Sequence, residues 1–312
     1  MGPKLAILTH EFDRYHNLSY YMRDFVKLWT LRGFEVTLVE GIKNPPPKVH
    51  VAMMHVDLSV VPQEYLDYAK QFPVVLNGNI TDITKRAYSQ LLLSKDDEYE
   101  GKVVVKSNLN AGGFPEERMA KAHPELGIRQ RQPSILYPAD ESVKEPNYLL
   151  YDAIQLVPSE VWGHPDVVVE KYLPEQVGEL YCARFWLFFG DKDFQYKAFS
   201  PNPICKGNIV RRELISEPVP EELRQVRKKL GFDFGKFDYA INDGNVILFD
   251  VNRTVTYGHA KSNITSLAAQ TLAPGIDFYK PRRSTTTSSV TISGIQNGAL
   301  PFQFSFSGTK PL

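Results

Sequence analysis

The stretch GKFDYAINDGNVILFDVNRT, residues 235–254, constrains the fold more than any other part of the sequence. Two apolar runs flank the tetrapeptide NDGN, and such a short connection rich in Asn, Asp and Gly is typical of a tight β-hairpin. Asp238 lies in the first run, and Asp250 and Asn252 lie in the second. Polar side chains among core residues are costly unless they are paired, hydrogen-bonded or bound to a metal. These three side chains therefore need a partner.

A magnesium site is one partner that fits Asp238, Asp250 and Asn252. Asp250 and Asn252 are two residues apart, so their side chains project from the same face of a strand. The hairpin brings Asp238 onto the adjacent strand, and three oxygen donors suit Mg²⁺, which often shares its ligands with nucleotide phosphates. The plainer interpretation is that these side chains cap exposed strand ends.

Composition excludes several classes of protein. The 312 residues, 43% of them hydrophobic, can form two domains or one large one around a real core. The 36 basic residues balance the 36 acidic ones, which gives no reason to expect a nucleic acid or a membrane as partner. Cys182 and Cys205 are too few and too far apart for a disulfide framework or a zinc site. The first apolar stretch is too short for a signal peptide, so we expect a cytoplasmic protein.

The pattern of apolar residues predicts an α+β protein in three parts. In residues 1–80, strand-like and helix-like segments alternate, which indicates a small parallel α/β domain. Residues 81–280 open with a predicted helix at TDITKRAYSQLLL and continue with strands, a helix at PEELRQVRKKLGF and the hairpin. Residues 281–312 are rich in Ser and Thr and are predicted to form a linker followed by one hairpin.

Lys106 ends the apolar run VVVK and precedes a loop that contains Gly112 and Gly113. Glycines let backbone amides approach an anion closely, so the lysine and the loop are candidates for binding phosphate oxygens. A strand-end lysine that reaches into water is the alternative. The segment is not a Walker loop, because GKS and GKT are absent.

The order of six segments resembles the ATP-grasp superfamily, which includes D-alanine–D-alanine ligase, glutathione synthetase and the ligases that add glutamate to a ribosomal protein. The segments are ITKRAYSQLLL, GKVVVKSNLNAGG, VVVEKYLPE, GELYCARFWLFFGD, GKFDYAI and ILFDVNRT, within residues 81–257. The resemblance implies an ATP-grasp nucleotide-binding and catalytic domain over residues 81–280. Residues 1–80 then correspond to the pre-ATP-grasp domain of those enzymes.

The resemblance also implies site residues, each carried over from a matching motif. The residues that would bind ATP are Lys85, Lys106, Gly112, Gly113, the adenine hinge Glu170, Lys171, Tyr172 and Leu173, and the ribose-binding Glu179. The metal ligands would be Asp238, Asp250 and Asn252, with Asp250 in place of the more usual Glu.

Three basic residues are expected to act in the reaction. Lys236, two residues before Asp238, corresponds to the cation that holds the acyl phosphate, and Arg184 and Arg212 are the other catalytic candidates. Lys206, Arg211 and Arg212 fall where such enzymes bind the γ-phosphate or a substrate carboxylate. Which of these three makes that contact is left open.

The function implied is an ADP-forming ligase that uses ATP and Mg²⁺, with Mn²⁺ as the alternative metal. ATP phosphorylates a carboxylate of a small molecule or peptide, and an amine or other nucleophile then displaces the phosphate. Two other functions are left open, an ATP-grasp kinase and a nucleotide-binding regulatory protein without turnover. A homodimer is also left open.

Overall fold

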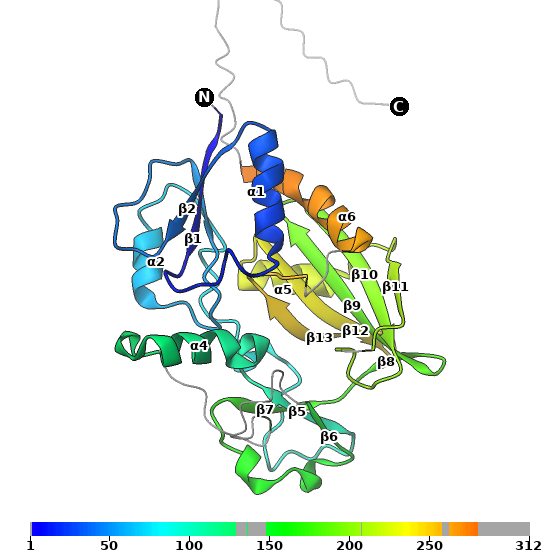
Figure 1. The fold of residues 1–312 in the computed structure, drawn as a ribbon. Helices are drawn as coiled ribbons and strands as arrows, with labels where there is room; N and C mark the ends of the chain where they lie inside the picture. Colours follow the sequence, from blue (N-terminus) through cyan, green and yellow to red (C-terminus); the bar gives the residue numbers. More distant parts are fainter. Residues whose placement is uncertain (1, 129–135, 137–147, 207, 258–261, 280–312) are drawn as a thin grey trace, which may run out of the picture. The chain divides into compact units, whose positions relative to one another are not determined.

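The computed structural model describes residues 2–128, 136, 148–206, 208–257 and 262–279 (Figure 1). Residues 1–280 form one compact unit. The predicted boundary between residues 80 and 81 inside this unit stays a prediction. The linker and hairpin predicted for residues 281–312 lie outside the described residues.

The N-terminal part contains a parallel sheet with strand order β2-β1-β3-β4. Its strands are β1 (Lys4–Thr9), β2 (Glu35–Glu40), β3 (Val51–Met54) and β4 (Val75–Leu76). Helix α1 (Tyr21–Leu31) connects β1 to β2, and α2 (Gln63–Ala69) connects β3 to β4. Strand β1 is central and almost wholly buried, as expected for a parallel strand covered on both faces. The predicted parallel α/β start is confirmed.

The largest sheet in the described part of the chain is antiparallel, with the order β11-β10-β9-β12-β13 and with β8 paired to β9. Its strands are β8 (Glu175–Val177), β9 (Leu180–Phe189), β10 (Lys192–Ser200), β11 (Arg211–Leu214), β12 (Phe234–Asn242) and β13 (Asn245–Asn252). Strands β12 and β13 are the predicted hairpin. Asp243 and Gly244 have φ of 48° and 79° in its turn, which a turn of this kind requires.

Alternate residues of β9 pack on opposite faces of this sheet. Leu187 and Phe189 belong to a core with α1 and α6 (Asn263–Leu272), and Trp186 and Phe188 belong to a core with α5 (Glu221–Leu230). Figure 1 shows α1 and α6 side by side, and the Trp29 indole donates to the Ala273 carbonyl at 2.7 Å. The α/β part and the large sheet therefore share one hydrophobic core.

A smaller antiparallel sheet, with the order β6-β5-β7, lies next in the chain. It consists of β5 (Val103–Ser107), β6 (Leu149–Tyr151) and β7 (Val167–Lys171). The Val-rich runs of β5 and β7 pack on a small core with Ile154 and Val161. The remaining helices are α3 (Lys85–Tyr88), α4 (Phe114–Ala122) and the 3₁₀ turns Asn110–Gly113, Pro124–Leu126, Ile154–Leu156, Ser159–Val161 and Ala273–Tyr279.

Of the helix predicted for TDITKRAYSQLLL, only Lys85–Tyr88 is helical, and the rest of the prediction is wrong. Helix α3 ends at Tyr88, and the chain returns to an extended conformation at Ser89. Leu91 then accepts a hydrogen bond from the Lys171 amide, and the Leu93 amide donates to Val169. Pairing with β7 satisfies the backbone of this extended segment. Leu91 is buried in one small core, and Leu93 packs, partly buried, against another.

The α+β class is confirmed by this mixture of a parallel sheet, two antiparallel sheets and covering helices. Within the described residues, no helix has both the length and the apolar character needed to cross a membrane.

Candidate functional site

The register of the β12–β13 hairpin gathers four of the predicted residues on one face. Asp238 lies directly opposite Asp250, and Lys236 lies opposite Asn252. Side chains that face each other across an antiparallel pair share a face, and so do residues two apart on one strand. Lys236 and Asp238 also lie opposite Leu187 and Phe185 of β9, so this is the face turned away from α5.

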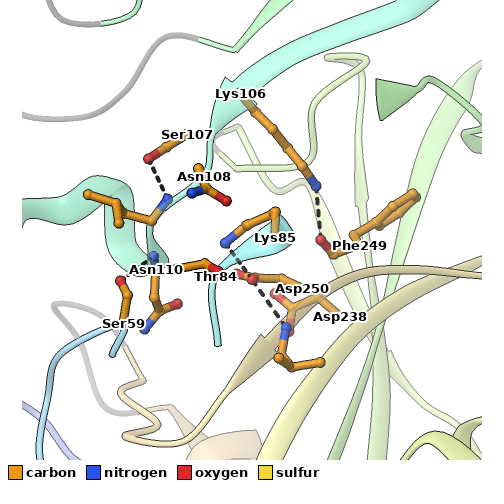
Figure 2. Close-up of polar contacts among 12 residues, drawn as sticks. Ser59, Thr84, Lys85, Lys106, Ser107, Asn108, Asn110, Asp238, Phe249 and Asp250 are labelled. Carbon is orange, nitrogen blue, oxygen red and sulfur yellow. Dashed lines mark hydrogen bonds and ion pairs between the residues drawn. The ribbon is translucent and has the colours of Figure 1, made fainter. Parts of the chain in front are cut away.

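Lys85 reaches this face from α3. Its side chain is only 3% exposed, and its Nζ lies 2.7 Å from Asp250 Oδ1 (Figure 2). The Tyr88 hydroxyl, three residues later, donates to the same oxygen at 3.0 Å. The single turn of α3 places these two residues on one side, so both converge on Asp250.

Lys106 reaches the site from the other antiparallel sheet. Its Nζ lies 2.6 Å from Glu170 Oε2 on the neighbouring strand β7, and both side chains are almost fully buried. The same Nζ donates to the Phe249 carbonyl of β13 at 2.9 Å (Figure 2). This burial contradicts the interpretation of Lys106 as a strand-end lysine that reaches into water.

A β-bulge explains why the Phe249 carbonyl is available. Asp238 pairs with Asp250, but Tyr239 pairs with Leu248, so Phe249 is an extra residue between two registered pairs. A bulge residue is left out of the ladder and bends the strand. The bulge therefore turns a backbone acceptor of the large sheet toward the lysine of the small sheet.

Lys236 completes the cluster, with its Nζ 3.0 Å from Asp238. Burial raises the pKa of the Asp238 carboxyl, and the nearby negative charge of Asp250 adds to the effect. Burial also acts against ionisation of Asp250, but the positive charges of Lys85, Lys106 and Lys236 hold its pKa at about 2. The two paired carboxyls thus differ strongly in acidity, and Asp250 is the more firmly ionised.

Two buried polar atoms of this cluster have no hydrogen-bond partner, namely Glu170 Oε1 and Asn252 Nδ2. Such atoms carry a cost of about 1–3 kcal/mol each unless something binds them. Carboxylate and amide oxygens are also the ligands that Mg²⁺ prefers. The donor set of Asp238, Asp250 and Asn252 therefore fits Mg²⁺. The described residues contain no group of three His, Cys, Asp or Glu side chains that could hold a metal.

A cavity of about 140 Å³ opens beside the cluster. One end is charged, with Lys106, Glu170, Asp238 and Asp250 in its wall. Apolar and aromatic residues make up most of the rest, namely Val104, Tyr148, Tyr172, Pro174, Tyr181, Ala183, Phe185, Pro203, Ile204 and Phe249. A molecule with a flat apolar part and a charged part matches this division.

The predicted hinge is only partly in this cavity. Glu170, Lys171 and Tyr172 line it, whereas Leu173 packs against a separate small core with Leu91. The amides of Lys171 and Tyr172 already donate to the carbonyls of Leu91 and Lys102 at 2.9 Å. Any hydrogen bonds from a ligand would therefore have to use other groups of the hinge.

The structure does not bring Glu179, Arg184 or Arg212 to the cavity wall. Glu179 is exposed in the turn between β8 and β9. Arg184 lies opposite Tyr239, on the α5 face, and grips the buried Glu175 with two charged hydrogen bonds of 2.7 Å. Arg212 is an exposed residue of the edge strand β11. Lys206 does line the cavity.

Gly112 and Gly113 lie in the turn between β5 and α4, both with positive φ. A side chain at position 113 would be strained, because φ is 74° and a Cβ there would lie 2.5 Å from a Leu109 side-chain carbon. Figure 2 shows Asn110 of the same turn beside Ser59, whose hydroxyl accepts from the Asn110 amide at 2.8 Å. The loop is therefore anchored to the α/β part just after Lys106.

Sequence reasoning missed Tyr88, Tyr148 and the Phe249 carbonyl. Tyr88 could have been found from its position three residues after Lys85 on a predicted helix. The role of Phe249 depends on the bulge, and no residue type in the hairpin signals it.

Comparison with known structures finds ATP-grasp ligases, the superfamily that the motifs resemble. An ATP-grasp RimK domain protein from Sphaerobacter thermophilus is 13% identical over 88% of this chain and 98% of its own, with a TM-score of 0.46. D-alanine–D-alanine ligase from Bacillus anthracis is 12% identical over 89% and 96%, with a TM-score of 0.46. A RiPP-associated ATP-grasp ligase from Chryseobacterium gregarium, in complex with ADP and a leader and core peptide, is 9% identical over 90% and 98%, with a TM-score of 0.47. Comparison with family models and with curated proteins finds no match.

Proposed function

We propose that the chain is an ADP-forming ligase that uses ATP and Mg²⁺ to activate a carboxylate as an acyl phosphate and joins it to an amine or other nucleophile. The observation that carries the proposal is the convergence of three lysine–carboxylate pairs, Lys85–Asp250, Lys106–Glu170 and Lys236–Asp238, beside an apolar cavity. Lys106, Glu170, Asp238 and Asp250 line this cavity. A nucleotide has the same division into a flat base and a chain of anions.

The ion pairs of this cluster can be exchanged for contacts with a bound nucleotide and metal. Each lysine is paired with one carboxylate, so the six side chains sum to no net charge. When a triphosphate and a divalent cation bind together, the lysines can turn to phosphate oxygens while Asp238, Asp250 and Asn252 hold Mg²⁺. The metal would neutralise charge on the transferring phosphoryl group. Binding then replaces existing ion pairs rather than leaving charges alone.

Lys236 is the cation we assign to the transferring phosphoryl group. Its ammonium lies against Asp238, 5.2 Å from the centre of the Phe185 ring in the cavity wall. Arg184 is not assigned a catalytic role, because its guanidinium is held by Glu175 on the other face of the sheet. Arg212 is left out because it is exposed on the edge strand.

The experiment is product analysis of the full chain with ATP, Mg²⁺ and pooled amino acids, peptides and hydroxy acids. We expect ADP and free phosphate, a condensed product in the mass spectrum, and loss of both when EDTA removes the metal. AMP and pyrophosphate would contradict the ligase proposal. A phosphorylated product without free phosphate would indicate a kinase, and nucleotide binding without any turnover would indicate a regulatory protein.

A further inference from the structure

Arg253 is a buried arginine that directly follows Asn252, one of the proposed metal ligands. Its side chain has no exposed surface, and it ranks with Trp29 and Trp186 among the largest fully buried side chains of the described residues. Burying a charged group is costly unless it is well hydrogen-bonded. Polar contacts must therefore hold this guanidinium, and its partners indicate what it does.

The guanidinium donates to three backbone carbonyls of the α/β part. Nη1 donates to the Ile80 carbonyl at 2.7 Å, and Nη2 donates to the carbonyls of Val56, at 3.1 Å, and Leu58. Val56 and Leu58 lie in the connection after β3, and Ile80 lies in the connection after β4. One side chain thus joins two connections of the parallel sheet to the strand that carries the proposed metal ligands.

Thr254 binds one of these connections as well. Its hydroxyl donates to Oδ1 of Asp57, which lies in the same segment, residues 56–58. The Tyr20 hydroxyl donates to Oδ2 of Asp57 at 2.7 Å and fixes this carboxylate from the other side. Arg253 therefore holds the backbone of residues 56–58 while its neighbour holds a side chain of the same segment.

The segment held by Arg253 continues into contacts that place other parts of the site. The Ile83 amide, two residues before Lys85, donates to the Ser59 carbonyl at 2.9 Å. The Ser59 hydroxyl accepts from the Asn110 amide, in the turn between β5 and α4 (Figure 2). Arg253 is thus connected by short runs of chain to Lys85 and to the turn that follows β5.

Asn252 needs an anchor at this point of the chain. It is the last residue of β13, and the ladder between β12 and β13 ends with the pair Lys236–Asn252. A ligand at the end of a strand is held by the ladder on one side only. The hydrogen bonds of Arg253 supply the other side, directly after the ligand.

We propose that Arg253 is a positioning residue that fixes Asn252, and with it Asp250, for binding of Mg²⁺. Groups behind the ligands commonly orient them in metal sites. Arg253 itself does not line the cavity. The inference rests on the proposed function, because it explains these contacts by the metal site proposed there.

The test is calorimetric titration of the full chain with ADP, with and without Mg²⁺, in the wild type and in Arg253→Lys. Lysine keeps the positive charge, but its single nitrogen cannot replace the two donor nitrogens of the guanidinium. We expect ADP affinity without metal to stay within about threefold of wild type. The factor by which Mg²⁺ strengthens ADP binding should fall on the order of 10-fold or more.

Arg227→Lys is the matched control. The Arg227 guanidinium also donates to three backbone carbonyls, those of Gly190, Phe232 and Asp233, at 2.8–3.0 Å. These contacts lie next to the start of β12 and not at the end of β13. Urea denaturation should show that both variants are less stable than the wild type. The effect of Mg²⁺ on ADP binding should change only in Arg253→Lys, which separates positioning from stability.

An unchanged effect of Mg²⁺ in Arg253→Lys would overturn the inference, and so would an equal loss in Arg227→Lys. If Arg253→Lys does not fold, Thr254→Val takes its place, because it removes only the hydroxyl contact with Asp57. The effect of Mg²⁺ should then fall on the order of 3-fold, and no change would overturn the inference.

The wild type alone tests the proposed function on which the inference rests. If it does not bind ADP, or binds ADP equally well with and without Mg²⁺, the proposed function is contradicted and the inference falls with it. Failure of the inference alone requires a wild type that shows the effect of Mg²⁺ and a variant that keeps it, so the two failures can be told apart.

Discussion

Lys106 is buried in the proposed nucleotide site and makes two polar contacts there. Burial lowers the pKa of its ammonium group, and Glu170 and the Phe249 carbonyl hold it in place. Removing the lysine alone would leave a buried carboxylate unpaired, at a cost of about 3–5 kcal/mol in stability. Its function must therefore be tested in a protein in which Glu170 is also neutral.

We expect Lys106→Met combined with Glu170→Gln to fold but to bind ATP on the order of 30-fold more weakly, because one charged contact to phosphate is lost. Phosphate release should nearly vanish. Titration with a fluorescent ATP analogue and a phosphate assay measure the two effects. Lys102→Met, an exposed lysine next to β5 that pairs with Asp152, is the control. Changes below about threefold in both assays would remove Lys106 from the site.

Lys236→Met should have a different signature. Its ammonium is assigned to the phosphoryl group in transfer, so we expect kcat to fall far more than ATP affinity, as for an interaction made mainly in the transition state. Lys192→Met, a partly exposed lysine of β10 that pairs with Asp191, serves as the control. An unchanged kcat would exclude Lys236 from the mechanism, and an equal loss of affinity would assign it to ground-state binding.

At the scale of elements, Asn77 joins the parallel sheet to the large antiparallel sheet. It follows β4, has a φ of 57° and is fully buried. Its side-chain oxygen accepts from the amides of Asp233 and Phe234 at 2.9 and 3.0 Å, and its Nδ2 donates to the Phe234 carbonyl at 2.8 Å. One side chain thus satisfies three backbone groups at the start of β12.

We expect Asn77→Ala to lower the free energy of unfolding by about 3 kcal/mol or more, because buried backbone groups lose their partners. Urea denaturation measures the change. The exposed Asn79→Ala, in the same connection, should lie within about 0.5 kcal/mol of wild type. Equal stability of the two variants would show that Asn77 does not hold the sheets together.

The elements also show what the sequence could predict. The NDGN turn specified the hairpin, and its register followed, so Asp238, Asp250 and Asn252 came together as expected. The side of β9 on which Arg184 projects depends on its register with β12, which no local pattern contains. The exposure of Glu179 depends on where the β8–β9 turn falls. The leucines after Ser89 have helical spacing, but pairing with β7 determined their conformation.

For the molecule as a whole, Asp13 should make stability depend on pH. Burial, together with the charge of Asp57, raises the pKa of Asp13 to about 7, although Tyr20 and Arg118 act in the opposite direction. The unfolded chain binds this proton only below about pH 4. The folded state therefore holds a proton that the unfolded state lacks, and stability is lost as pH rises toward 7.

We expect the free energy of unfolding of the wild type to fall by about 2 kcal/mol more than that of Asp13→Asn between about pH 5 and pH 7. Urea denaturation at a series of pH values gives both slopes. Asp67→Asn, on the surface of α2, should keep the wild-type slope over this range. Parallel slopes for wild type and Asp13→Asn would mean that Asp13 is ionised throughout.

At the bulge, the backbone carbonyl and the side chain of Phe249 have different roles. Its carbonyl holds Lys106 at the charged end, while its side chain forms part of the apolar wall. Every amino acid has the same backbone carbonyl, so the hydrogen bond from Lys106 to this carbonyl does not depend on which side chain occupies position 249. Position 249 is therefore where the cavity can be reshaped, for instance to accept an enlarged nucleobase from a synthetic ATP analogue, while the charged end keeps its contacts.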